Sequence, residues 1–112
     1  DIKKDKNKFQ IFINISRLLK RLLTGEDVNR ALFIDFLNGL IILEEYNIKE
    51  ELHNIEIIIV LRILNNLGYI GENEKLKNLI KSPFEKDLIF EVAKSRVNIL
   101  NEINKALRES GL

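Results

Sequence analysis

The sequence predicts an all-α fold: a bundle of four main helices plus one short helix, in a single domain of residues 1–112. Three observations lead to this prediction. The composition, 46% hydrophobic and 31% charged over 112 residues, is typical of one globular domain. Apolar residues recur at spacings of three and four along most of the chain, which is the period of an amphipathic helix. The single proline, Pro83, stands where a helix can begin.

The first helix is predicted over residues 8–23, and Gly25 is expected to end it. Apolar residues cover most of its surface. Its polar residues are spaced four, three and four apart, so they form one narrow stripe: Gln10, Asn14, Arg17 and Arg21. A helix that meets water along one edge only is expected to be deeply packed. The preceding residues 1–8 are expected to form a loosely held linker.

A second helix is predicted from an N-cap at Asp27 to about Glu45. Only Arg30, Asp35 and Asn38 interrupt its apolar middle. A helix that is apolar on nearly all sides is normally buried, so this segment is predicted to be the central core helix.

A third helix is predicted from about Lys49 to Leu67, with Asn47 as its cap and Gly68 as its end. The stretch 57–61 is rich in isoleucine and favours a β-strand by propensity, so a buried strand is the competing prediction. The helix is favoured because acidic residues precede this stretch and Arg62 follows it within one long segment.

The last third of the chain predicts a short helix around residues 74–79 and then a long one. The motif Ser82-Pro83-Phe84-Glu85 predicts the start of the long helix, with Ser82 as N-cap, Pro83 as first helical residue and Glu85 as capping-box acid. The long helix is expected to end at about Glu109. Its apolar stripe consists of Phe84, Leu88, Val92, Ile99, Ile103 and Leu107.

The net charge of +1 is unevenly distributed along the chain. Residues 1–30 carry eight bases and four acids, residues 31–60 one base and six acids, and residues 61–112 nine bases and seven acids. The basic start and the acidic middle of the chain either pair within the fold or mark two separate surfaces.

The sequence assembles no residues for catalysis or metal binding. There is no cysteine, and the only histidine, His53, is expected to be an ordinary surface residue. The acid pairs Glu44–Glu45 and Glu50–Glu51 are interpreted as solvated helix ends rather than a metal site, because sequence neighbours do not share a helix face. No apolar run approaches the ~20 residues of a membrane span. We therefore expect no enzymatic activity, no cofactor, no metal and no membrane association.

A cluster of cations is predicted at the end of the first helix: Arg17, Lys20 and Arg21. Cations at a helix C-terminus stabilise the helix by about 0.3–1 kcal/mol each, which gives the cluster a structural explanation. The functional alternative is a site for phosphate or carboxylate groups.

Single-stranded DNA is expected to bind only weakly and by charge. The net charge is close to zero. Bases stack on exposed aromatic side chains, whereas four phenylalanines have the spacing of helical core residues: Phe9, Phe12, Phe33 and Phe36.

Three stretches of the sequence form a known pattern. They are Leu18-Leu19-Lys20-Arg21-Leu22-Leu23, Ala31-Leu32-Phe33 and, as the tightest match, Leu61-Arg62-Ile63-Leu64-Asn65-Asn66-Leu67-Gly68-Tyr69-Ile70. Together with the closing residues 103–110 they span most of residues 16–110. On these residues the chain resembles the C-terminal helical domain of the RecO family, bacterial recombination mediators and DNA-annealing proteins.

The chain departs from the family in two respects. RecO proteins carry an N-terminal OB-fold that supplies a major DNA-binding surface and is absent from this sequence. Because the chain also opens on Asp1 instead of methionine, we interpret it as an excised domain or a processed product. Many members also carry a four-cysteine zinc motif after the Gly-Tyr turn. Residues 71–82 contain no cysteine, so zinc is not carried over.

The resemblance implies a non-enzymatic role in DNA repair and recombination, in the bacterial cytoplasm and associated with the nucleoid. It implies two protein partners, RecR and the acidic C-terminal tail of single-stranded DNA-binding protein. The candidate residues for binding a partner or DNA are Arg17, Lys20, Arg21 and Arg62. For Arg62 an intramolecular ion pair with an acid in residues 35–56 is an equal alternative. The alternative function is a helical protein–protein interaction or dimerisation module without a nucleic-acid role.

Overall fold

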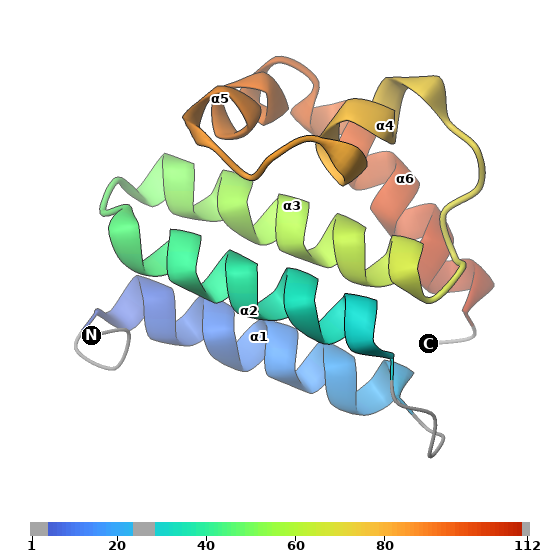
Figure 1. Cartoon of the computed structure of the whole chain (residues 1–112), viewed down its shortest axis with the longest axis horizontal. Helices are drawn as coiled ribbons and strands as arrows, with labels where there is room; N and C mark the ends of the chain where they lie inside the picture. Colours follow the sequence, from blue (N-terminus) through green and yellow to red (C-terminus); the bar gives the residue numbers. More distant parts are fainter. Residues whose placement is uncertain (1–4, 24–28, 111–112) are drawn as a thin grey trace.

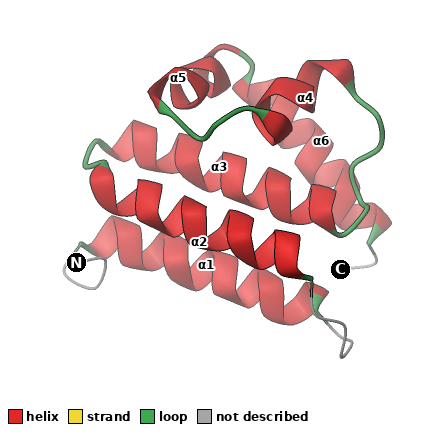
Figure 2. Cartoon of the chain, in the orientation of Figure 1, coloured by secondary structure: helices red, strands yellow, loops and turns green. Residues whose placement is uncertain are grey.

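The computed structural model describes residues 5–23 and 29–110, and all regular secondary structure in these residues is helical (Figures 1 and 2). The prediction of an all-α fold is confirmed. The alternative of a strand at residues 57–61 is wrong, because this stretch lies within a helix. The six helices are α1 (Lys6–Leu22), α2 (Arg30–Glu45), α3 (Lys49–Asn66), α4 (Glu74–Lys81), α5 (Lys86–Lys94) and α6 (Arg96–Glu109).

The other five described helices are arranged around α3. Helices α1, α2 and α3 lie side by side with alternating directions, and α4, α5 and α6 lie across the other side of α3 (Figure 1). Helix α3 contacts each of the other five helices. From Leu52 to Leu64 nearly every residue of α3 is buried, because neighbours cover this helix on all sides. The core of the molecule is therefore built on α3.

The prediction that the second helix is the central one is wrong. Within α2 only Leu32, Gly39 and Leu43 are buried. Its outward face instead exposes several large apolar side chains, among them Ile34 and Leu37. Both α2 and α3 are apolar on most sides, and the packing encloses α3 while leaving α2 at the surface.

The last turn of α3 confirms the predicted role of Gly68. Its φ of 83° lies in the left-handed region that favours glycine. The amide of Tyr69 donates to the carbonyl of Leu64 at 2.9 Å, and the amide of Gly68 donates to the carbonyl of Asn65 at 3.0 Å. These two bonds form a Schellman motif, which satisfies carbonyls that a helix end would otherwise leave unpaired.

The starts of α2 and α3 differ from the predicted caps. Asn29 is the N-cap of α2, and its side-chain oxygen accepts from the amide of Leu32 at 3.0 Å. The predicted cap, Asp27, lies outside the described residues, as does Gly25. Ile48 precedes α3 without a side-chain cap, so the prediction of Asn47 as cap is wrong.

The predicted linker is wrong for residues 6–8, which belong to α1. The side chain of Asp5 caps this helix by accepting from the amides of Asn7 at 2.9 Å and Lys8 at 3.1 Å. Lys8 is buried, and its ammonium group donates to the carbonyl of Glu44 at 2.7 Å and to the side-chain oxygen of Asn47 at 3.1 Å. A cation from α1 thus stabilises the C-terminal end of α2. Residues 1–4 lie outside the described part of the chain.

The predicted long helix after Ser82 is in fact two helices, which explains six helices instead of five. Ser82 ends α4: its amide donates to the carbonyl of Asn78 at 3.0 Å, and its hydroxyl donates to the Asn78 side chain. Helix α5 therefore starts after Glu85, and Ser95 separates it from α6. The break allows two helices with different directions to pack on α3, one burying Val92 and the other Ile99 (Figure 1).

Candidate docking groove and cationic surface

The described residues hold no group of three or more histidine, cysteine, aspartate or glutamate side chains placed to bind a metal ion. His53 is half-exposed, and its Nδ1 lies 3.9 Å from Oε1 of Glu56 on the same helix. In residues 5–23 and 29–110, none of the helices is long and apolar enough to cross a membrane.

Three of the four predicted site residues lie together. Arg17, Lys20 and Arg21 are exposed on the C-terminal half of α1. Arg17 and Arg21 are one helical turn apart and share a face. Because α1 and α2 run in opposite directions, these cations lie at the end of the molecule where α2 begins with exposed Arg30 (Figure 1).

Arg62 lies apart from the α1 cations. It is 7% exposed, and its side chain contacts α2, the end of α4 and the segment that follows α4. Its Nε donates to the carbonyl of Leu79 at 3.1 Å, and its Nη2 donates to the carbonyl of Ser82 at 2.5 Å. Its guanidinium carbon lies 5.1 Å from the centre of the Phe84 ring, a cation–π contact.

Arg62 also forms an intramolecular ion pair, one of the two alternatives that the sequence left open for it. Its Nη1 lies 3.9 Å from Oδ1 of Asp35, whose other oxygen accepts from the side-chain amide of Asn66 at 2.7 Å. Burial lowers the pKa of the Arg62 guanidinium, and the charge of Asp35 opposes this shift. Arg62 is therefore a structural cation that joins α2, α3 and the end of α4.

A groove of about 480 Å³ runs between α2 and the segment that follows α4. Arg62 forms part of its lining, together with the exposed cation Lys81. The lining is apolar or cationic with a few neutral polar groups and includes no carboxylate: Asn38, Ile41, Ile42, Arg62, Lys81, Ser82, Pro83 and Phe84. The sequence singles out Arg62 but not Lys81 or Phe84, because the motif Ser82-Pro83-Phe84 predicts a helix start there.

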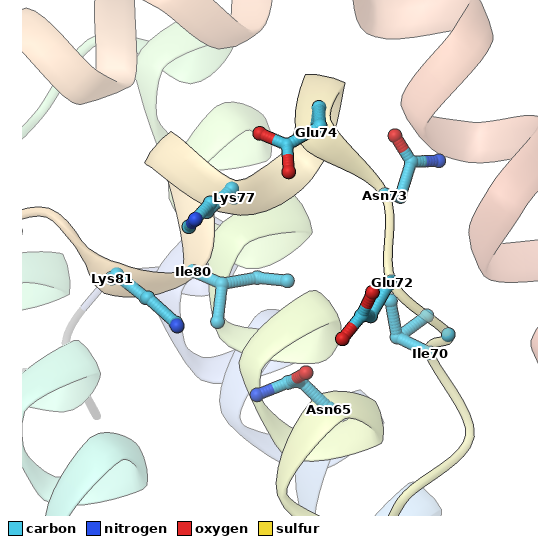
Figure 3. A pocket seen from close by; sticks show the side chains of 9 residues that line it. Asn65, Ile70, Glu72, Asn73, Glu74, Lys77, Ile80 and Lys81 are labelled. Atoms are coloured by element: carbon cyan, nitrogen blue, oxygen red, sulfur yellow. The ribbon is translucent and has the colours of Figure 1, made fainter.

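A second hollow, of about 250 Å³, lies beside the turn that follows α3 (Figure 3). Ile80 and Lys81 project into it from α4, Asn65 projects from α3, and Glu72 projects from the connecting loop. Acids and bases are mixed in its lining, which also includes Glu74 and Lys77. The first groove therefore suits an anionic partner better than this second hollow does.

Comparisons with known proteins do not identify a relative of this chain. No protein-family model, no curated protein and no solved structure matches the chain.

Proposed function

We propose that this chain is the helical module of a RecO-like protein, which acts without catalysis in bacterial recombinational DNA repair. Its task is to dock protein partners, the acidic C-terminal tail of single-stranded DNA-binding protein and RecR, during strand annealing and recombinase loading. The proposed location is the cytoplasm, at the nucleoid. The observation that carries this proposal is the groove beside α2, which combines apolar walls with a cationic rim.

The groove has the chemistry that an acidic peptide with an apolar end requires. The apolar end would pack against Ile41, Ile42 and Phe84, and the carboxylates would approach Lys81 at the rim. Exposed charge pairs contribute only about 0–1 kcal/mol each, so the apolar contacts provide most of the affinity. A micromolar complex, roughly −8 kcal/mol, is the expected order.

Arg62 acts on this groove indirectly. Its hydrogen bonds hold the carbonyls of Leu79 and Ser82, and its guanidinium group lies on the ring of Phe84. These contacts fix the groove wall that follows α4. Arg62 is thus a positioning residue, and Lys81 takes the role of contacting the peptide.

The exposed cations of α1 are assigned a separate role. Arg17, Lys20 and Arg21 lie on another helix from the groove lining, and they present the charge that phosphate groups of single-stranded DNA attract. Under the alternative function, an interaction module without a nucleic-acid role, a protein partner would still dock in the groove, but the α1 cations would not bind DNA.

The test is a titration of the acidic tail peptide against the full chain by isothermal calorimetry. Lys81→Glu reverses the rim charge and is expected to weaken binding about tenfold. Phe84→Ala removes an apolar wall and is expected to weaken it by a similar or larger factor. Lys75→Glu is the matched control, because Lys75 is an exposed lysine of α4 that does not line the groove.

Two outcomes would contradict this proposal. If the wild-type chain does not bind the tail peptide, the docking role is wrong. If Arg17→Glu/Arg21→Glu abolishes binding while Lys81→Glu leaves it unchanged, the tail docks on α1 and the groove assignment is wrong. RecR binding is tested separately by co-sedimentation with the same variants.

A further inference from the structure

The outward face of α2 carries a straight stripe of large apolar side chains. Phe33, Ile34, Leu37 and Ile41 are 44%, 52%, 56% and 58% exposed, and their spacing places them on one side of the helix. Helix α2 stands in front of α1 and α3 in Figure 1, so the described helices leave this face open. Soluble proteins rarely expose such a contiguous apolar patch unless it forms an interface.

At each end of α2, the exposed terminal residue carries the charge that is unfavourable for the helix dipole. Arg30 is the first residue of α2 and Glu45 is its last, and both are exposed. A helix N-terminus carries partial positive charge and a C-terminus partial negative charge. The first turn of α2 contains no acid and the last turn contains no base. Lys8 of α1 supplies one cation at the C-terminal end, through the carbonyl of Glu44.

We propose that a second copy of this chain covers the stripe, with the two α2 helices antiparallel about a two-fold axis. The axis passes between residues 37 and 38, the midpoint of α2. Positions 30 and 45 are equally far from this midpoint, as are positions 34 and 41. Arg30 therefore meets Glu45 of the other copy, Ile34 meets Ile41, and the two Leu37 side chains lie next to each other.

Charge complementarity selects a second copy over other occupants. A two-fold interface uses the same patch twice, so the patch must be complementary to itself after rotation. The α2 stripe meets this condition because it is basic at one end, apolar in the middle and acidic at the other end. An acidic peptide would match Arg30 but be repelled by Glu45. The inference does not depend on the tail-docking proposal; Ile41 belongs to both surfaces and is left unchanged in the tests.

The first test measures the mass of the full chain by sedimentation equilibrium from micromolar to millimolar concentration. The wild type is expected to change from monomer to dimer in this range. Leu37→Glu is expected to weaken dimerisation roughly 100-fold, because two carboxylates would face each other at the axis. Val97→Glu is the matched control, since Val97 on α6 is 71% exposed and distant in sequence from α2. A wild type that stays monomeric, or a dimer that Leu37→Glu leaves unchanged, would overturn the proposal.

The second test uses surface charges alone, so folding is not at risk. Arg30→Glu and Glu45→Arg each place like charges opposite each other in a homodimer, and each is expected to weaken it roughly tenfold. Mixing the two variants restores both opposite-charge pairs, so the mixture is expected to form a heterodimer at wild-type strength. If the mixture dimerises no better than either variant alone, the antiparallel register is wrong.

Discussion

Arg62 carries a positive charge at a position that is only 7% exposed. The sequence singles it out because a charge interrupts an otherwise apolar helix. In the structure this charge is buried, and two carbonyls, the carboxylate of Asp35 and the ring of Phe84 surround the guanidinium group. A buried cation is tolerated only with such partners. The planar guanidinium group of arginine, with five donors in a fixed fork, can bind several acceptors and lie against an aromatic ring at once, whereas the ammonium group of lysine has no flat face.

Asn54 presents the opposite case, a buried polar side chain with poor hydrogen bonding. It is 6% exposed, and its Nδ2 donates to the carbonyl of Ile89 over a long 3.4 Å. Its Oδ1 has no hydrogen-bond partner among the described residues. Burial of an unsatisfied oxygen costs free energy that an apolar side chain of the same shape would not incur.

We therefore predict that Asn54→Leu stabilises the fold by about 1 kcal/mol. Chemical denaturation of the wild type and the variant measures the change. Asn54→Asp is the control of equal size, and it is expected to destabilise because it buries a charge. If Asn54→Leu lowered the free energy of unfolding, the amide would have a stabilising partner that this structure does not contain.

At the scale of helices, the contact of α2 with α3 depends on a glycine. Gly39 is buried, and a Cβ atom built there would lie 2.5 Å from Cγ1 and 2.7 Å from Cδ1 of Ile59. These distances are far inside van der Waals contact. Ile59 itself is 1% exposed and so has little space to move. The close approach of the two helices therefore requires the absence of a side chain at position 39.

Gly39→Ala is predicted to destabilise the fold by about 1–2 kcal/mol, although alanine alone favours a helix over glycine by about 1 kcal/mol. Thermal and urea unfolding measure the effect. The same change in an Ile59→Ala background is expected to be neutral or stabilising, because the clashing atoms are gone. An equal loss of stability in both backgrounds would show that the contact with Ile59 is not the cause.

The sequence predicts a helix end correctly where the backbone conformation of a single residue determines it. Gly68 was correctly predicted because a left-handed residue is needed there and glycine adopts it without strain. Ser82 was misinterpreted because serine can end one helix or begin the next, and its bonds to Asn78 settle the choice. The break at Ser95 had no local signal; it follows from packing two helices on α3.

At the scale of the whole molecule, the basic and acidic residues that are separated along the sequence lie at opposite ends of the α1–α2 pair. The cations Arg17, Lys20, Arg21 and Arg30 lie at one end of the α1–α2 pair (Figure 1). The acids at the end of α2 and the start of α3 lie at the other end. Of the two interpretations that the sequence left open, two separate surfaces describes this arrangement. Lys8, at the start of α1, contacts the backbone of α2 at the acidic end.

Two aromatic residues differ from their predicted placement. Phe9 and Phe33 were expected in the core, and they are 41% and 44% exposed. Phe12 and Phe36 are half-buried, with ring centres 6.5 Å apart. On α2, Phe33 is followed by Ile34 and Leu37, which favour an apolar partner over stacked bases.

Binding of single-stranded DNA is predicted to be weak and electrostatic. With about three phosphate contacts from the α1 cations, the logarithm of the affinity should fall against the logarithm of salt concentration with a slope near −2. Fluorescence anisotropy with a labelled oligonucleotide measures this slope. Arg17→Glu/Arg21→Glu should abolish binding, and Lys105→Glu on α6 is the control. Tight binding that resists salt would instead indicate stacking on the exposed phenylalanines.

The sequence by itself determined the all-α class, the approximate positions of the first three helices and the turn at Gly68, because helical period and glycine conformation act over a few residues. Only the tertiary structure decided that α3 rather than α2 is central. It alone brought Lys81 and Phe84 beside Arg62, and it alone left Leu37 at the surface. The physical reason is that the number of apolar residues in a helix determines how much of its surface favours burial. Which of two apolar helices is enclosed depends on how segments distant in sequence pack around each of them.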